Sequence, residues 1–203
     1  MELHPDLKAY IVTTEVGPML QHPLIHQLFF GTKLETEWAN QAYEQKKAAV
    51  HEAILAGDWN TVLILHERPY RVSVLTRVPR DTPDYWDMVA TWWCDTEFPS
   101  HHLDVWIELL DHPDAHRMMD PDERAVFDSL PEVVTVYRGV GAEGGEDGLS
   151  WTLSREKAEW FAQRFATDDD TGWVEERTIR KALITAYVDR RNEREVIVLP
   201  RHW

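Results

Sequence analysis

The chain has one cysteine among its 203 residues and no long apolar run. Because Cys94 stands alone, no disulfide can form within the chain, and the fold must be stable without one. A run of about 18 apolar residues does not occur, which excludes an ordinary transmembrane helix. Residues 1–14 lack the basic start and apolar centre of a secretory signal. These absences predict a cytoplasmic protein with no membrane partner, acting in a bacterium or in a host cell.

Basic residues are also scarce, with 21 Lys and Arg against 36 Asp and Glu, a net charge of −15. Most of the excess lies in residues 1–130, which hold 22 acidic and 10 basic residues. Such acidity disfavours broad contact with nucleic acid or with an anionic membrane. A local basic groove near residues 177–191 is still compatible with it. The hydrophobic content of 43% excludes a disordered chain and predicts one large domain or two small ones.

The pattern changes from helical to strand-rich near Pro131. Before this point, composition and apolar spacing predict helices over 35–56, 83–95, 101–110 and 121–130. The segment 61–78 fits either strands or helices. After Pro131, β-branched runs predict strands. We therefore predict a mostly helical N-terminal region over 1–130, packed with a strand-rich region over 131–203.

A strand that ends in an arginine is the first of three polar segments in the last third of the chain. The apolar run 133–137 is followed by Arg138 and Gly139. A guanidinium is planar and always charged, so it can hold a phosphate through two hydrogen bonds. Glycine lets a ligand approach the backbone closely. Arg138 is therefore a candidate phosphate ligand, and the alternative is an ordinary surface arginine.

The second segment is a short strand, Ser150, Trp151 and Thr152, placed before a helix. Ser154 is expected to cap that helix, and apolar residues at 158, 161, 162 and 165 form one helical face. Ser150 can orient a carboxylate by a hydrogen bond, or it is an ordinary serine at the end of a strand.

The third segment is a pair of glutamates that opens an apolar strand. Glu193 and Glu195 precede the run 196–199, and side chains alternate along a strand, so both should lie on one side, roughly 7 Å apart. One carboxylate of such a pair can hold a substrate while the other stabilises charge. The alternative is a solvated strand start, in which the carboxylates pair with the nearby arginines 190, 191 and 194.

Together the three segments resemble the arginine–serine–glutamate class of ADP-ribosyltransferases, over residues 133–200. The family carries an arginine at a strand end, a Ser-x-Ser/Thr strand before a helix, and a Glu/Gln-x-Glu strand followed by aliphatic residues. The resemblance implies an α+β fold with a split, two-sheet core around a cleft for NAD, preceded here by the helical region.

The resemblance also implies how NAD is held. Arg138 would bind the phosphates, and the backbone of Gly139 would hydrogen-bond the nicotinamide amide. Ser150, Trp151 and Thr152 would border the NAD site. Trp151 departs from the small residue usual in the family, and the spacer between Arg138 and Ser150 is shorter than usual.

The carboxylates receive separate roles by the same resemblance. Glu195, oriented by Ser150, would bind a ribose hydroxyl and stabilise the oxocarbenium-like state as nicotinamide leaves. Glu193 would engage the acceptor, and a glutamate at this position goes with arginine as the acceptor in the family.

Other readings of the sequence are rejected or left as alternatives. Residues 139–144 match G-x-G-x-x-G, but no helix opens at the third glycine, so we expect a mobile loop over 139–148 rather than a dinucleotide fingerprint. A second loop, 166–173, is expected to move on NAD binding.

Clustered histidines at 101, 102, 112 and 116 lack a zinc motif, and no metal is predicted. The tryptophans at 86, 92, 93 and 106 are expected in the core.

The sequence thus predicts a mono-ADP-ribosyltransferase that moves ADP-ribose from NAD to a macromolecular acceptor. The first candidate for the acceptor is an arginine side chain of a protein. Enzymes of this kind serve as toxins, effectors or phage-encoded modifiers. One alternative is the modification of nucleic acid, which the acidity disfavours. Another is a non-enzymatic interaction module that retains the fold.

Overall fold

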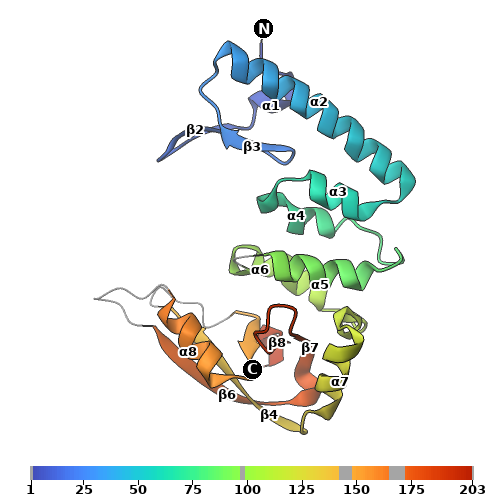
Figure 1. Cartoon of the computed structure of the whole chain (residues 1–203), viewed down its shortest axis with the longest axis vertical. Helices are drawn as coiled ribbons and strands as arrows, with labels where there is room; N and C mark the ends of the chain where they lie inside the picture. The colour runs from blue at the N-terminus through green and yellow to red at the C-terminus, as the bar shows by residue number, and fades with distance from the viewer. Residues whose placement is uncertain (1, 97–98, 142–147, 165–171, 203) are drawn as a thin grey trace. The chain divides into compact units, whose positions relative to one another are not determined.

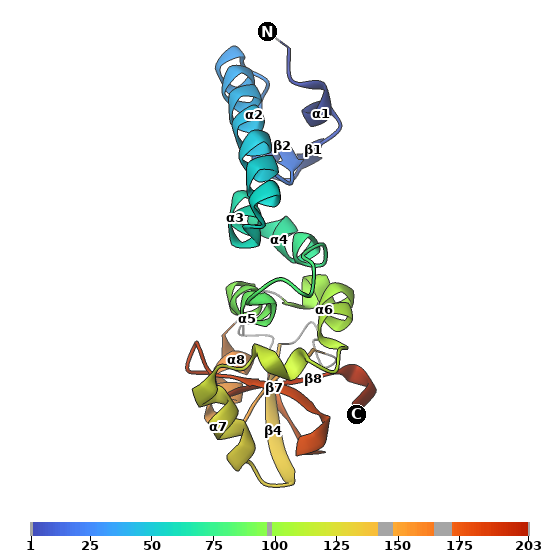
Figure 2. The ribbon, with the colours of Figure 1, turned by 90° about the vertical axis from the view of Figure 1, so that its right-hand side faces the viewer.

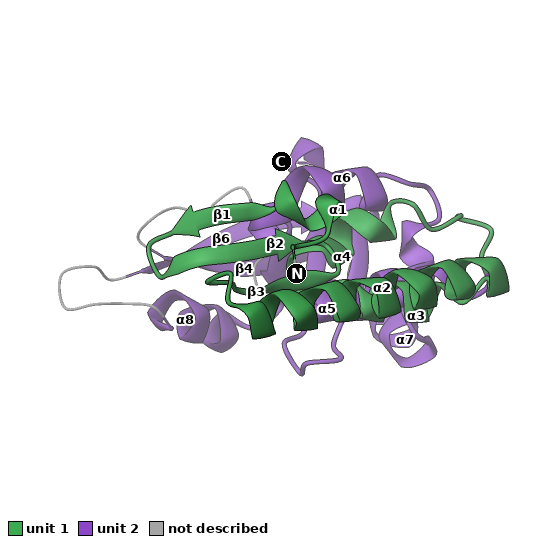
Figure 3. Ribbon diagram, turned by 90° about the horizontal axis from the view of Figure 1, so that it is seen from above, with its two compact units in different colours: residues 1–82 green, residues 83–203 purple. Residues whose placement is uncertain are grey.

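The computed structural model describes residues 2–96, 99–141, 148–164 and 172–202 (Figure 1). The chain forms two compact units, residues 1–82 and 83–203 (Figure 3). Each unit combines helices with an antiparallel sheet, so the fold is α+β as predicted. Within the described ranges, no helix has both the length and the apolarity to cross a membrane.

The first unit contains a small sheet that the sequence pattern did not predict. The strands β1 (Ile11–Thr14), β2 (Gly17–His22) and β3 (Ile25–Leu28) pair in that order. The helices of the unit are α1 (Pro5–Lys8), α2 (Lys33–Ala56), α3 (Trp59–Leu65) and α4 (Arg68–Leu75). Leu20, Ile25, Ala39 and Tyr43 are buried in one cluster, which joins the sheet to α2.

The ends of α2 follow directly from its sequence. Thr32 and Glu35 form a reciprocal capping box at its start, and Gly57 ends it with a left-handed φ of 69°. These are the ordinary start and stop signals of a helix. The segment 61–78, which fitted strands or helices, contributes the helices α3 and α4.

The second unit is built on one antiparallel sheet in the order β6-β4-β5-β8-β7. Its strands are β4 (Val133–Val140), β5 (Ser150–Thr152), β6 (Trp173–Arg180), β7 (Ile184–Val188) and β8 (Glu195–Val198). Its helices are α5 (Tyr85–Asp95), α6 (Leu103–Leu110), α7 (Pro121–Ser129) and α8 (Arg155–Gln163). The unit also contains short 3-10 helices, which are η1 (Pro99–His102), η2 (Ala115–Met118), η3 (Lys181–Leu183) and η4 (Pro200–His202). The strands that carry the three polar segments all belong to this sheet. Among the described residues of this unit the strands form one sheet, whereas a split, two-sheet core was expected.

The two units divide at residue 82, not at the predicted boundary of 130. The helices between residues 82 and 130 are part of the same unit as the sheet, because their side chains contact its strands. Helix α7 packs against β7 (Figure 2). Glu123 on α7 accepts a hydrogen bond from the backbone N–H of Asp189, at 2.8 Å. On α5, the indole N–H of Trp93 donates to Glu195 at 3.1 Å. The strand-rich segment therefore shares one core with helices α5–α7.

Candidate functional site

The three polar segments lie on neighbouring strands. β5 stands between β4 and β8, with Thr152 opposite Tyr137 on one side and Glu195 on the other. Residues directly opposite each other in an antiparallel sheet share a face. Tyr137, Thr152 and Glu195 therefore lie on one face, and Arg138 lies on the opposite face. The strand order joins the segments, but Arg138 and Glu195 point to different sides of the sheet.

Glu195 is a buried carboxylate with a complete set of partners. It is 2% exposed. Its Oε1 accepts from the indole of Trp93 at 3.1 Å, and its Oε2 lies 3.4 Å from Nη2 of Arg191. Burial raises the pKa of this carboxyl above its ordinary value of 4.5, while Ser150, Arg191 and Trp93 act against the rise.

Glu193 does not sit on the strand, which corrects the expected geometry of the glutamate pair. Strand β8 begins at Glu195, and Arg194 has a left-handed φ of 49°. Alternation along a strand therefore does not apply to residue 193. Its carbonyl instead accepts from Oγ1 of Thr152 at 2.7 Å, and the carbonyl of Arg194 accepts from the N–H of Leu153 at 2.9 Å. Both carboxylates nevertheless reach one common partner.

That partner is Arg191, whose guanidinium spans the two carboxylates. Nη2 lies 2.9 Å from Oε2 of Glu193 and 3.4 Å from Oε2 of Glu195, and Nη1 donates to the carbonyl of Cys94 at 3.0 Å. The sequence offered this pairing as the alternative to a catalytic pair. Arg190 points elsewhere, to Asp87 at 2.9 Å.

Arg138 is held against the backbone of β5 and the residues before it. Its Nη1 donates to the carbonyl of Ser150. A Cβ at Gly148 would lie 1.9 Å from the guanidinium, so any other residue there would require this side chain to move. Strand β4 continues to Val140, two residues beyond Arg138, so the arginine lies within the strand rather than at its end. Ser150 thus contacts Arg138 through its carbonyl.

Gly139 makes room for a helix rather than for a ligand. A Cβ at this position would lie 2.2 Å from the carbonyl oxygen of Ala158 and 2.5 Å from the backbone N of Ala162, both on α8. Helix α8 begins at Ser154, whose side chain caps it as expected. The close approach that the glycine permits is therefore made by α8.

Trp151 and Thr152 are both buried. The indole of Trp151 donates to the carbonyl of Gly148 at 3.1 Å, and the guanidinium carbon of Arg177 lies 4.9 Å from its ring centre. The hydroxyl of Thr152 also accepts from the N–H of Ser154 at 3.0 Å. These contacts make the strand a rigid support for Ser150.

Sequence reasoning missed the contribution of Trp93, which comes from a helix 102 positions earlier in the chain. No local pattern distinguishes it from the other tryptophans, and all four that were expected in the core are buried. Cys94, next to it, is half-buried, and burial raises the pKa of its thiol to about 11. A thiol of that pKa is protonated near neutral pH and is a poor nucleophile.

Two expectations fall partly outside the described residues, namely the loops over 139–148 and 166–173. Trp173 itself is described; it opens β6 opposite Val140 and is half-exposed. In the described ranges, no group of three or more His, Cys, Asp or Glu side chains is arranged to hold a metal ion.

No protein-family model, curated protein or solved structure matches the chain.

Proposed function

We propose that the second unit is a mono-ADP-ribosyltransferase that uses NAD as substrate and a macromolecular acceptor, a protein arginine first. The observation that carries the proposal is Glu195. This buried carboxylate lies on strand β8, and Ser150 lies on the adjacent strand β5, from which the resemblance implies that it orients Glu195. Arg138 lies on β4, the strand on the other side of β5, so the three polar segments occupy three consecutive strands of the sheet.

In the proposed reaction, the bond between nicotinamide and ribose C1′ breaks, and positive charge develops on the ribose. Glu195 stabilises this charge, and its fixed position means that little reorganisation is needed during the reaction. Ser150 and Trp93 hold the carboxylate in place. Nicotinamide leaves with the bonding electrons, and a nitrogen of the acceptor guanidinium then bonds to C1′ and loses a proton. Glu193, which shares Arg191 with Glu195, would receive this proton.

The proposal requires a movement of Arg191. Its guanidinium lies on the two carboxylates that would have to meet the ribose and the acceptor. Because the Arg191 side chain is 35% exposed, it can turn toward solvent without opening the core. Glu195 would then be accessible to the ribose, while the backbone of the sheet stays in place.

The test is transfer of radiolabel from NAD to a cell lysate by the purified protein and its variants. Glu195→Gln keeps the shape of the side chain and removes its charge, and we expect a loss of about 10²–10³ in rate. Glu156→Gln, on the exposed face of α8, is the matched control and should retain full activity. If Glu195→Gln releases nicotinamide as fast as the unaltered protein, the assignment fails.

Two other outcomes identify the alternatives. Label removed by nuclease and not by protease would indicate a nucleic acid acceptor. The absence of nicotinamide release under all conditions would favour the non-enzymatic module. In that case the ion pairs between Arg191 and the two glutamates would be purely structural.

A further inference from the structure

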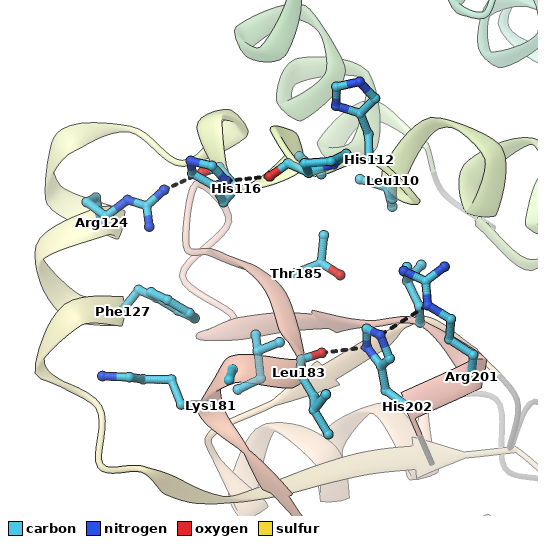
Figure 4. Close-up of a pocket in the computed structure, with 15 residues that line it drawn as sticks. Leu110, His112, His116, Arg124, Phe127, Lys181, Leu183, Thr185, Arg201 and His202 are labelled. Atoms are coloured by element: carbon cyan, nitrogen blue, oxygen red, sulfur yellow. Dashed lines mark hydrogen bonds between the residues drawn. The ribbon is translucent and has the colours of Figure 1, made fainter.

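A groove on the second unit lies apart from the glutamate pair. It has a volume of about 440 Å³ and is lined by residues of η2, α7, η3, β7 and η4 (Figure 4). Small-molecule sites in proteins start at about 300 Å³. The groove is therefore large enough for a small organic ligand.

The lining of the groove is basic, although the protein is strongly acidic. Three of the described lining residues are cations (Arg124, Lys181 and Arg201), three are histidines that are counted as neutral at pH 7 (His112, His116 and His202), and none is acidic. The whole chain carries a net charge of −15. A concentration of cations in a concave surface attracts anions, because low-dielectric walls focus the field.

The cations at one end are held by an aromatic ring and by the end of a helix. Arg124 and Lys181 lie 5.7 and 6.0 Å from the ring centre of Phe127. Lys181 donates to the carbonyl of Leu130 at 2.9 Å, and Arg124 donates to the carbonyl of His116 at 2.7 Å. These contacts are to neutral groups, so the positive charges of both side chains are not cancelled by them.

At the other end, Arg201 and His202 extend from η4. Nη1 of Arg201 pairs with Asp111, a carboxylate outside the lining, and its Nε lies 3.2 Å from Nε2 of His202. Nδ1 of His202 donates to the carbonyl of Leu183 at 2.7 Å. Figure 4 shows the Thr185 side chain between this end and the Arg124 end. The two ends together provide donors around a common space.

His112 borders the groove, and its ring packs against Trp86, with the ring centres 5.5 Å apart. Its Nδ1 accepts a hydrogen bond from the backbone N–H of Asp114, at 3.1 Å. A ring nitrogen that accepts carries no proton, so the proton of the neutral ring is on Nε2. The remaining ring nitrogen of His112 is therefore a donor in the neutral state.

We propose that this groove binds a small phosphate monoester whose organic part is apolar. Guanidinium groups match the oxygens of a phosphate, an ammonium group adds charge, and the hydroxyl of Thr185 is a further donor. The organic part would rest on Leu110, Leu183 and Phe127, which also line the groove. The groove is separate from the residues of the proposed transferase reaction, and the proposal does not depend on that reaction.

The experiment is calorimetric titration of the full chain with phenyl phosphate, phenol and inorganic phosphate at one salt concentration. Phenyl phosphate should bind at least tenfold more tightly than either of the others, because it alone uses both the cations and the apolar floor. Arg124→Gln and Arg201→Gln should each weaken its binding about tenfold, the scale of one charge-assisted hydrogen bond. Circular dichroism would establish that both variants fold.

Two control variants make the result specific. Arg117→Gln alters an exposed arginine on η2 that is not among the lining residues, and binding should be unchanged. Arg138→Gln should also leave binding unchanged, since Arg138 is not among the lining residues. The proposal is overturned if phenyl phosphate does not bind, if phenol binds equally well, or if Arg138→Gln removes binding while Arg201→Gln does not.

Discussion

Glu195 is the residue on which the proposed reaction rests, and it is buried in the second unit. A carboxylate that is 2% exposed is costly to ionise, and the structure offsets this cost with one arginine, one indole and one serine. A group placed in this way is common at functional sites, although structural ion pairs show the same features. Its titration is therefore open to a direct test.

The raised pKa of Glu195 predicts how stability depends on pH. Folded Glu195 retains its proton at a pH where the unfolded chain, with a pKa near 4.5, has lost it. The unaltered protein should therefore lose stability relative to Glu195→Gln as pH rises from 4.5 through the raised pKa. Denaturant unfolding of both proteins between about pH 4 and pH 8 measures this difference. A difference that stays constant over this range would contradict the raised pKa.

Arg191 should oppose NAD binding while it stabilises the fold. Arg191→Gln frees the carboxylate pair, and we expect NAD to bind roughly three- to tenfold more tightly, about 1 kcal/mol. The melting temperature should fall, because Glu195 loses a charged partner that is itself partly exposed to solvent.

Arg190→Gln is the control for this effect, since Arg190 pairs with Asp87 and lies near Glu123 rather than Glu195. It should leave NAD affinity unchanged. Weaker NAD binding by a folded Arg191→Gln protein would show that Arg191 helps to hold the substrate.

Among the elements, β4 and α8 approach each other closely at Gly139. Gly139→Ala places a methyl group within 2.2 Å of the backbone of α8, so the helix must shift. We expect a loss of about 1–3 kcal/mol in the free energy of unfolding, measured with denaturant. Gly141→Ala has nothing within 4 Å of the new methyl group and should change stability by no more than about 0.5 kcal/mol. Equal losses for both variants would exclude close packing as the cause.

Elements with local start and stop signals were predictable from the sequence. The capping boxes at Thr32 and Asp120 and the serine cap at Ser154 set the starts of α2, α7 and α8. These signals act between residues three positions apart, so they can be seen in the sequence. The predicted starts agree with the observed ones to within a few residues.

Elements that depend on distant partners were not predictable. Strands β1–β3 have short, mixed patterns, and it is their pairing that makes them a sheet. Glu193 is a similar case, because Arg194 is left-handed and strand β8 begins only at Glu195, two residues later than the pattern suggested. At the site, the sequence indicated Ser150 and Glu195 as partners, but not the indole of Trp93 or the face on which Arg138 lies.

At the scale of the whole molecule, the division at residue 82 places every residue of the proposed site in one unit. The first unit has its own buried cluster around Leu20 and Ile25. In the second unit, the sheet shares its core with α5–α7, through Trp93 and Glu123. The composition change near Pro131 is thus a boundary between kinds of secondary structure and not between folding units.

This difference predicts how fragments of the chain behave. A fragment of residues 83–203 should fold by itself, because it contains the sheet together with the helices that cover it. A fragment of residues 131–203 should not fold, because it lacks Trp93 and Glu123 and would expose the apolar side of the sheet. Cooperative thermal unfolding followed by near-ultraviolet circular dichroism distinguishes the two fragments. If 131–203 unfolds cooperatively and binds NAD as 83–203 does, the helices are dispensable and the earlier boundary is the correct one.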